Sequence, residues 1–340
     1  MSSEQRPYDV YGVGNALVDI LAFVDNPFLS NFELPKGGMT LMDPPRQADI
    51  LHQLEQNELH LASGGSAANT MIGLAQSGGK GFFCGKVAAD THGEFYKRDM
   101  EEFGIGFETP MATKDGTPTG TCVVLTTPDA ERTLCTHLGV AVGLTTDDID
   151  AEHIAQCKIS YIEGYLWDSE GPREACRLAM QTSKEVGTKV AFTVSDAFLI
   201  DRFADEFKQA IADYCDILFC NADEARMLCG TDSLEECAKM LGAMAPLVFL
   251  TNSEHGCVVI ENGAEGVQVD GFKVDAIDTV GAGDAFAGGA LYGITNGMSA
   301  AQAARWGNFL ASHVVSIVGP RLTEKMGDRI GEVVGVSQAE

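Results

Sequence analysis

Residues 278–286, which read Asp-Thr-Val-Gly-Ala-Gly-Asp-Ala-Phe, carry the clearest chemical signal in the sequence. They follow a predicted strand and open a predicted helix. The small residues Gly281, Ala282 and Gly283 permit a tight turn whose N–H groups converge at a helix N-terminus, where anions bind. A fixed carboxylate, Asp284, would repel a resting phosphate there. It makes chemical sense if it takes a proton from a hydroxyl while the amides stabilise a moving phosphoryl group.

Two better-known glycine-rich phosphate sites do not match this segment. No Lys-Ser or Lys-Thr pair follows the glycines, so the segment is not a P-loop. The dinucleotide fingerprint needs a third glycine in the first strand–helix unit, and Gly12-Val13-Gly14 lacks it.

Polar residues near the N-terminus suggest a site for hydroxyl groups. Asn15 and Asp19 follow the first predicted strand. Aspartate is disfavoured in strands, so Asp19 is either a ligand for vicinal hydroxyls or an edge residue facing water. Gly64-Gly65 lets the backbone approach a ligand, with Asn69 nearby to bond hydroxyls. The alternative is an ordinary glycine turn with Ser66 as the helix N-cap.

Two further positions have both a functional and a structural interpretation. Asn221 and Glu224 follow a predicted strand at its carboxyl end and share one face of a helical turn, which suits Mg²⁺ bound through water. The same pair is also a common helix cap. Arg132 lies on a predicted hairpin strand, where it is either a cation that closes onto the phosphoryl group or a solvated residue.

These residues need a scaffold, and the hydrophobic pattern predicts one in which strands and helices alternate. From about residue 145, strands are predicted at 159–163, 189–194, 217–220 and 247–251, and helices at 172–186, 203–215, 222–229 and 234–243. This alternation predicts a mostly parallel sheet covered on both faces. Residues 120–125 and 132–137 flank Pro128-Asp129-Ala130 and predict a separate β-hairpin that acts as a flap. The polar tail after Arg321 is expected to be peripheral.

Length and composition limit the function classes. The chain has 340 residues, an apolar share of 45% and a formal net charge of −26. Such an acidic surface repels nucleic acid and anionic membranes, so we expect neither as a partner. The ten cysteines show no metal-binding spacing and are interpreted as buried free thiols. No signal peptide or membrane span is evident, so a cytoplasmic protein is expected.

The motifs together resemble the PfkB (ribokinase-like) family of sugar and nucleoside kinases. Gly64-Gly65 with Asn69 resembles its N-terminal signature, residues 278–284 its C-terminal signature, and Asn221-x-x-Glu224 its magnesium-associated motif. The resemblance implies one catalytic domain over residues 1–340. Its fold would be a doubly wound α/β sheet with helices on both faces. A small β-sheet lid would be formed by parts of residues 15–62 and 113–140.

The resemblance also assigns roles to residues. Asp284 would be the catalytic base, and in the turn that begins at Gly281 the amides of Ala282, Gly283 and Asp284 would form the anion hole. Arg132 on the hairpin stays the candidate for the closing cation. The acceptor would contact Asn15, Leu17, Asp19, Met39, Leu41, Gly64, Gly65, Asn69 and Cys122; ATP would contact Asn221, Thr251, Gly256 and Asn308; Asn221 and Glu224 would hold Mg²⁺. Asp278 lies where relatives often bind a monovalent cation, so K⁺ is a further cofactor to test.

Within the family the sequence is most similar to its nucleoside kinases, through Gly12-Val13-Gly14-Asn15-Ala16-Leu17-Val18-Asp19-Ile20 and Pro118-Thr119-Gly120-Thr121-Cys122. We therefore expect ATP-dependent phosphorylation of a nucleoside 5′-hydroxyl, with adenosine preferred. The alternatives are an inosine–guanosine kinase, a ribokinase- or fructokinase-type sugar kinase, and a non-catalytic nucleoside or nucleotide sensor. The protein would act on small molecules as a monomer or homodimer.

Overall fold

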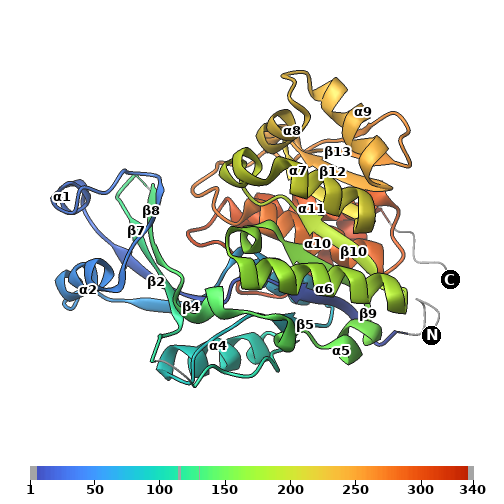
Figure 1. The fold of residues 1–340 in the computed structure, drawn as a ribbon. Helices are drawn as coiled ribbons and strands as arrows, with labels where there is room; N and C mark the ends of the chain where they lie inside the picture. Colours follow the sequence, from blue (N-terminus) through green and yellow to red (C-terminus); the bar gives the residue numbers. More distant parts are fainter. Residues whose placement is uncertain (1–5, 114–115, 130, 336–340) are drawn as a thin grey trace.

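The computed structural model describes residues 6–113, 116–129 and 131–335 (Figure 1). The hairpin residue Ala130 and the first five residues, on which the expectation of no signal peptide was based, lie outside the described ranges. Within those ranges, none of the helices combines the length and apolar character needed to traverse a bilayer.

The larger of two sheets has nine strands in the order β14-β13-β12-β11-β10-β9-β1-β5-β6. All neighbours pair in parallel except β12 with β13 and β13 with β14. The strands are β1 (Tyr8–Val13), β5 (Gly81–Cys84), β6 (Ile105–Gly106), β9 (Cys157–Glu163), β10 (Lys189–Thr193), β11 (Ile217–Asn221), β12 (Leu247–Thr251), β13 (Cys257–Glu261) and β14 (Val267–Val269). This confirms the predicted mostly parallel α/β sheet.

Helices cover both faces of this sheet (Figure 1). One face carries α3 (Ser66–Gln76), α10 (Ala282–Thr295) and α11 (Ala300–Val314); the other carries α5 (Ala151–Gln156), α6 (Glu170–Val186), α7 (Ala197–Tyr214), α8 (Ala222–Cys229) and α9 (Leu234–Met244). Strand side chains alternate between the two layers. In β11, Ile217 and Phe219 belong to the hydrophobic core on the side of α3, α10 and α11. Leu218 and Cys220 belong to the core on the side of α5 to α9.

The smaller sheet forms a separate lobe with the order β3-β8-β7-β2-β4 (Figure 1). Its elements are β2 (Leu17–Phe23), β3 (Met39–Leu41), β4 (His60–Gly64), β7 (Gly120–Thr126), β8 (Arg132–His137), α1 (Asn26–Asn31) and α2 (Pro44–Gln53). One face packs on the two helices, with Val18 and Ile20 against Leu29 and Ile50. The other face is turned toward the carboxyl ends of the large sheet. We call this sheet the lid.

Side-chain caps fix where helices begin, and the start of one helix differs from its predicted position. Helix α2 begins at Pro44 because the Asp43 side chain accepts from the Arg46 amide. Helix α7 begins at Ala197, before the predicted start, and a kink at Phe203 separates its first turns from the rest.

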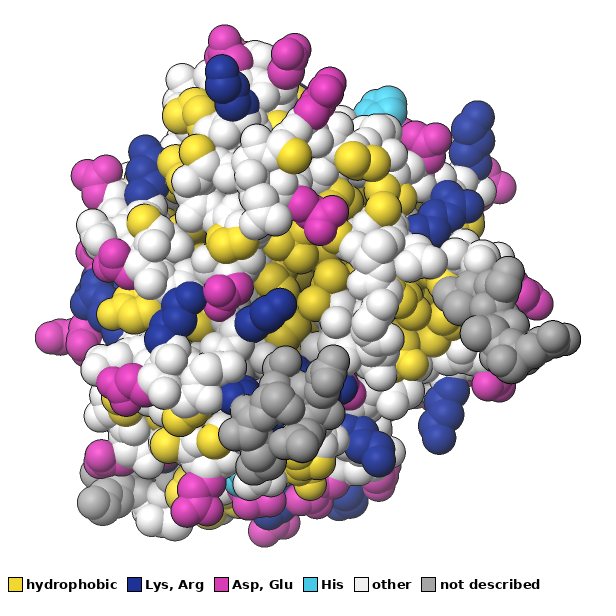
Figure 2. Space-filling model, turned by 90° about the vertical axis from the view of Figure 1, so that its right-hand side faces the viewer, with side chains coloured by type: hydrophobic (Ala, Val, Ile, Leu, Met, Phe, Trp, Pro, Cys, Tyr) yellow, Lys and Arg dark blue, Asp and Glu magenta, His cyan; other side chains and the backbone are white. Residues whose placement is uncertain are grey.

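The expectation of a peripheral tail holds only in part, because most residues after Arg321 are exposed or half-buried but two are not. Leu322 and Met326 are buried beside α11, and the Gln76 side chain donates to the Leu322 carbonyl. The remaining helices, α4 (Thr91–Glu102) and α12 (Ile330–Val334), pack beside β4 and α11 respectively. On the side away from the lid, acidic and basic side chains are interspersed around a recess lined by hydrophobic groups (Figure 2).

Candidate active site

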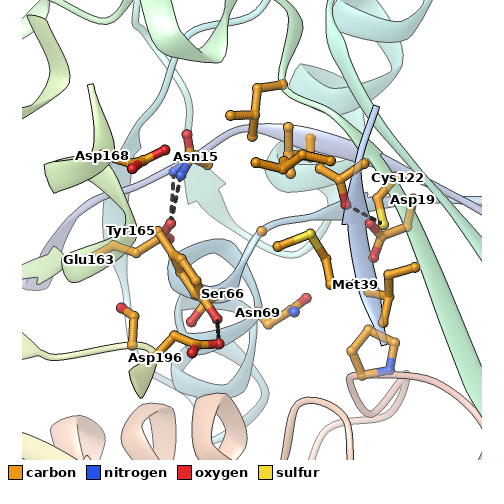
Figure 3. Close-up of a pocket in the computed structure, with 18 of the residues that line it drawn as sticks. Asn15, Asp19, Met39, Ser66, Asn69, Cys122, Glu163, Tyr165, Asp168 and Asp196 are labelled. Atoms are coloured by element: carbon orange, nitrogen blue, oxygen red, sulfur yellow. Dashed lines mark hydrogen bonds between the residues drawn. The ribbon is translucent and has the colours of Figure 1, made fainter. Parts of the chain in front are cut away.

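A pocket of about 390 Å³ lies between the lid and the carboxyl ends of β1, β9 and β10 (Figure 3). Its floor comes from the first turns of α3 and α10, and its roof from the pocket-facing side of the lid. Ligands bind at this end of parallel α/β sheets because the strand ends and helix N-termini converge there. The pocket contains most of the residues expected from the sequence to contact the acceptor.

Asp284 lies on the first turn of α10 and points its carboxylate at α3. Ser66 Oγ donates to its Oδ1 at 2.6 Å, and Asn69 Nδ2 donates to its Oδ2 at 3.1 Å. The residue keeps some solvent contact, but densely packed protein surrounds the carboxylate. This burial raises its pKa to about 6, and the two hydrogen bonds oppose the rise.

The turn before Asp284 forms the expected cradle with one correction. Gly281 has a φ of 79°, and a Cβ there would lie 2.0 Å from the Pro320 carbonyl oxygen, so this position requires glycine. The amide of Ala282 donates to the Thr279 carbonyl at 3.3 Å and is therefore not free for an anion. The amides of Gly283 and Asp284 have no backbone acceptor among the described residues, so these two remain available.

Asp19 faces the pocket and is buried, so the interpretation as an edge residue facing water was wrong. Strand β2 lies inside the lid sheet, between β7 and β4. Burial raises the Asp19 pKa to about 6, although the charges of Arg321 and Arg132 lower it. Gly64 does not line the pocket itself. A Cβ on Gly64 would lie 2.3 Å from Asp19 Oδ1, so the glycine makes room for the carboxylate.

Glu163, at the end of β9, is a pocket residue that the sequence analysis missed. Its Oε1 accepts from Asn15 Nδ2 at 3.0 Å and its Oε2 from the Ala67 amide at 2.8 Å. Burial raises its pKa to about 7. Asn15, expected to contact the acceptor, is thus held by Glu163 (Figure 3). The available signal was an acidic residue ending an apolar strand just before Gly164.

Arg132 is neither solvated nor free to swing in this structure. Its side chain is 2% exposed, and its Nε lies 2.8 Å from Asp278 Oδ2, although the N–H is not aligned for a hydrogen bond. Its buried Nη2 has no acceptor among the described residues. Arg132 also lines the pocket, which brings a cation from the lid to the turn that precedes Asp284.

The roof of the pocket is apolar. Leu17 and Cys122 are buried there, whereas Met39 and Leu41 are 45% and 50% exposed. Further apolar side chains on this wall are Val124, Leu134, Leu138 and Val142. The exposure of the two β3 residues indicates a pocket that is open toward solvent at that edge.

Comparison with known proteins identifies the chain. The sequence pattern of the pfkB family carbohydrate kinases matches residues 33–325. The protein belongs to the PfkB family. The crystal structure of adenosine kinase from Sinorhizobium meliloti is 36% identical and superposes with a TM-score of 0.87, covering 96% of this chain and 99% of that one. The ribokinase-like fold and kinase class are thereby established.

Sequence relatives within the PfkB family have two kinds of name. A 5-dehydro-2-deoxygluconokinase from Shouchella clausii is 30% identical over 261 residues, which is 74% of this chain and 80% of the relative. Adenosine kinase from Saccharomyces cerevisiae is 28% identical over 330 residues, or 91% and 95% of the two chains. The family therefore fixes phosphoryl transfer but leaves the acceptor open.

PfkB membership implies ATP, and the residues expected to contact it lie apart from the acceptor pocket. Thr251 ends β12, next to the Asn221 end of β11. Gly256 has a φ of 85° and packs against Val269, whose carbonyl accepts from Asn308 Nδ2 at 3.0 Å. Thr251, Gly256 and Asn308 thus border the same end of the sheet, with the Asn308 amide engaged by the backbone.

The Asn221–Glu224 pair forms the helix cap that was the alternative interpretation. Asn221 Oδ1 accepts from the Glu224 amide at 2.9 Å, and Glu224 Oε2 accepts from the Asn221 amide at 2.9 Å. Burial raises the Glu224 pKa to about 7, with smaller contributions from Asp196 and Asp223. Glu224 Oε1 also accepts from Asn221 Nδ2 at 2.8 Å, so both carboxylate oxygens are engaged by Asn221. Among the described residues no group of three or more His, Cys, Asp or Glu side chains could hold a metal directly, so the pair would contact Mg²⁺ only through its water shell. Bound there, Mg²⁺ would neutralise phosphate charge.

The expected role of Asp278 in binding K⁺ is not supported by its side-chain contacts. Its Oδ1 accepts from the Val280 amide at 3.0 Å, and its Oδ2 accepts from the Gly319 amide at 3.1 Å and faces Arg132. The arginine supplies the counter-charge that an alkali ion would otherwise provide. In this arrangement the Asp278 carboxylate does not fit a K⁺ ligand.

Proposed function

We propose that this PfkB kinase transfers the γ-phosphate of ATP to the 5′-hydroxyl of a nucleoside, with adenosine preferred. The observation that carries the proposal is the division of the pocket into two parts. A polar end holds Asn15, Asp19, Asn69 and Asp284, and a long apolar wall of the lid extends away from it. A pentose fills the polar end, and a nucleobase covers the apolar wall.

The polar end has free acceptors for sugar hydroxyls. Asn69 Oδ1 is buried without a hydrogen-bond partner, which is costly unless a ligand supplies a donor. The buried carboxylate of Asp19 offers two oxygens to vicinal hydroxyls. These groups hold the ribose so that its 5′-hydroxyl reaches Asp284.

Asp284 then removes the hydroxyl proton as the oxygen attacks the terminal phosphorus. Its raised pKa of about 6 lies close enough to neutrality for a general base that is ionised at pH 7. The free amides of Gly283 and Asp284 donate to the transferring phosphoryl group, and Arg132 supplies positive charge from the lid. The apolar wall excludes water, which limits the hydrolysis of ATP.

The charge of the pocket separates nucleosides from sugar acids. Five acidic side chains line it, namely Asp19, Glu163, Asp168, Asp196 and Asp284. Of the residues that the structure describes, Arg132 is the single Lys or Arg in the lining, and Asp278 already faces it. A carboxylate-bearing acceptor would therefore be repelled, whereas a neutral nucleoside would not.

A sugar kinase remains the second candidate, favoured by the 30% identity to a 5-dehydro-2-deoxygluconokinase. A panel of adenosine, inosine, guanosine, ribose, a ketohexose and 5-dehydro-2-deoxygluconate, with ADP formation as the readout, decides between the candidates. We expect the highest kcat/KM with adenosine and negligible turnover of the sugar acid. Preferred use of the sugar acid would overturn the proposal, and ADP formation independent of every acceptor would argue for a different function.

The base assignment has a separate test. Asp284→Asn keeps the size of the side chain and removes its capacity to accept a proton. We expect kcat to fall by about 10²–10⁴-fold, the usual contribution of a general base, with the acceptor KM nearly unchanged. Turnover within a few-fold of the wild type would exclude Asp284 as the base.

A further inference from the structure

The carboxylate of Asp278 connects three separate segments of the chain. Its Oδ1 accepts from the Val280 amide in the anion-hole turn at 3.0 Å. Its Oδ2 accepts from the Gly319 amide, in the segment that follows α11, at 3.1 Å and lies 2.8 Å from Arg132 Nε of the lid. Both charged side chains are almost fully buried, at 2% and 3% exposure.

We propose that Asp278 is a positioning residue that holds the lid arginine over the anion-hole turn. Two sides of the Arg132 guanidinium have different surroundings. Its Nε side faces the Asp278 carboxylate, which stays in place, while its Nη2 remains buried and without an acceptor. A charged N–H that is buried without an acceptor calls for one, and Arg132 lines the pocket in which a phosphoryl oxygen would supply it.

The same carboxylate links the position of the lid to the shape of the cradle. Val280 precedes Gly281, and both line the pocket. Asp278 fixes the Val280 amide and also faces Arg132. The lid strand β8 and the anion-hole turn are therefore held in one relative position by the same carboxylate. Without a negative charge at Asp278, a buried guanidinium would lose its counter-charge and leave the site.

This inference rests on the proposed contact between Arg132 and the phosphoryl group, and the variants separate the two. Arg132→Ala tests that contact, and Asp278→Asn tests the positioning. We expect each to lower kcat by at least about tenfold while the acceptor KM changes less than about threefold. If Arg132→Ala leaves kcat intact, the proposed role of Arg132 fails. If only Asp278→Asn leaves it intact, the positioning role fails.

A double-mutant cycle distinguishes positioning from general structural support. Adding Asp278→Asn to Arg132→Ala should cost little further turnover, because the charge has no arginine left to hold. Additive losses would overturn the proposal. The matched control is Asp9→Asn at the opposite end of the sheet, where Asp9 accepts from Lys158 Nζ at 2.8 Å and from the Lys80 amide at 2.9 Å. It should retain kcat.

Chemical rescue keeps the test decisive even if the variants differ in stability. Millimolar guanidinium added to Arg132→Ala should restore part of the lost turnover, since the free cation can bind between Asp278 and the phosphoryl group. It should not restore Arg132→Ala/Asp278→Asn. Equal rescue of both would show that Asp278 does not hold the cation. If Asp278→Asn does not fold, Arg132→Lys takes its place in the test. One ammonium group cannot contact both the Asp278 carboxylate and the phosphoryl group, so the kcat of Arg132→Lys should approach that of Arg132→Ala. Near wild-type turnover of Arg132→Lys would contradict the proposal.

Discussion

Ser66 Oγ lies 2.6 Å from Asp284 Oδ1, which makes a side chain expected only as a possible helix cap into a direct partner of the proposed base. The helix N-cap position itself belongs to Gly65, with a φ of 101°. A hydroxyl that donates to a carboxylate favours its ionised form. Ser66 therefore opposes the rise that burial causes in the Asp284 pKa.

Removing this hydroxyl should move the pH profile upward. In Ser66→Ala the Asp284 pKa rises further above about 6, so the unprotonated base becomes scarcer below neutral pH. We expect the acid limb of log kcat against pH to shift up by about one unit, in line with about 1.5–3 kcal/mol for a hydrogen bond to a charged group partly replaced by water. Ser66→Thr, which keeps the hydroxyl, is the control. An unmoved acid limb in Ser66→Ala would refute the assignment.

The sequence predicted the scaffold and the motif residues but not their partners. The alternation of strands and helices located the large sheet, and residues 278–284 identified the turn that carries Asp284. Glu163 was missed because one acidic residue at a strand end does not reveal which groups meet it. The pair between Arg132 and Asp278 joins two distant segments, so no local pattern could indicate it.

Local reasoning also failed where backbone groups compete. A turn of small residues predicts converging amides, but it does not tell which of them the turn itself uses. The Ala282 amide is used by Thr279, which leaves Gly283 and Asp284. Likewise, Asn221 and Glu224 satisfy a helix-cap pattern and a metal pattern with the same spacing, so sequence alone could not separate the two roles.

Glu163 gives a pH-dependent stability prediction. Burial raises its pKa from 4.5 to about 7, so the native state favours the protonated form. The associated stabilisation is fully present below pH 4.5 and is lost as the pH rises through about 7. Its upper bound is on the order of 3 kcal/mol. Glu163→Gln should therefore have a flatter dependence of the free energy of unfolding on pH between 5 and 8.

Urea unfolding of the wild type and Glu163→Gln at several pH values measures this difference. The exposed acidic residue Glu58 provides the control, since Glu58→Gln should leave the curve parallel to that of the wild type. If the Glu163→Gln curve is also parallel to that of the wild type, burial does not raise the pKa of the Glu163 carboxyl group. Turnover is measured separately, because Glu163 also orients Asn15.

The exposed apolar residues of the lid should contribute to nucleoside binding more than to stability. Met39→Ala and Leu41→Ala remove surface that is about half exposed in the free protein, so Tm should change little. Contact with a nucleobase would be lost, which we expect to raise the KM for adenosine about three- to thirtyfold. The KM for ribose should stay the same, because a pentose does not reach this wall. An equal rise for both acceptors would contradict the placement of the base.

Gly281 and Gly283 offer a matched pair of substitutions in one turn. An added Cβ at Gly281 meets the Pro320 carbonyl oxygen at 2.0 Å and must adopt a φ of 79°, whereas at Gly283 nothing lies within 4 Å. Gly281→Ala should thus lower the free energy of unfolding by at least about 2 kcal/mol, from left-handed strain together with displacement of the tail. Gly283→Ala should preserve or raise it, since alanine is favoured over glycine in a helix by about 1 kcal/mol. Thermal unfolding of the two variants checks the contrast. Equal Tm values would mean that close packing of Pro320 against Gly281 does not constrain the turn.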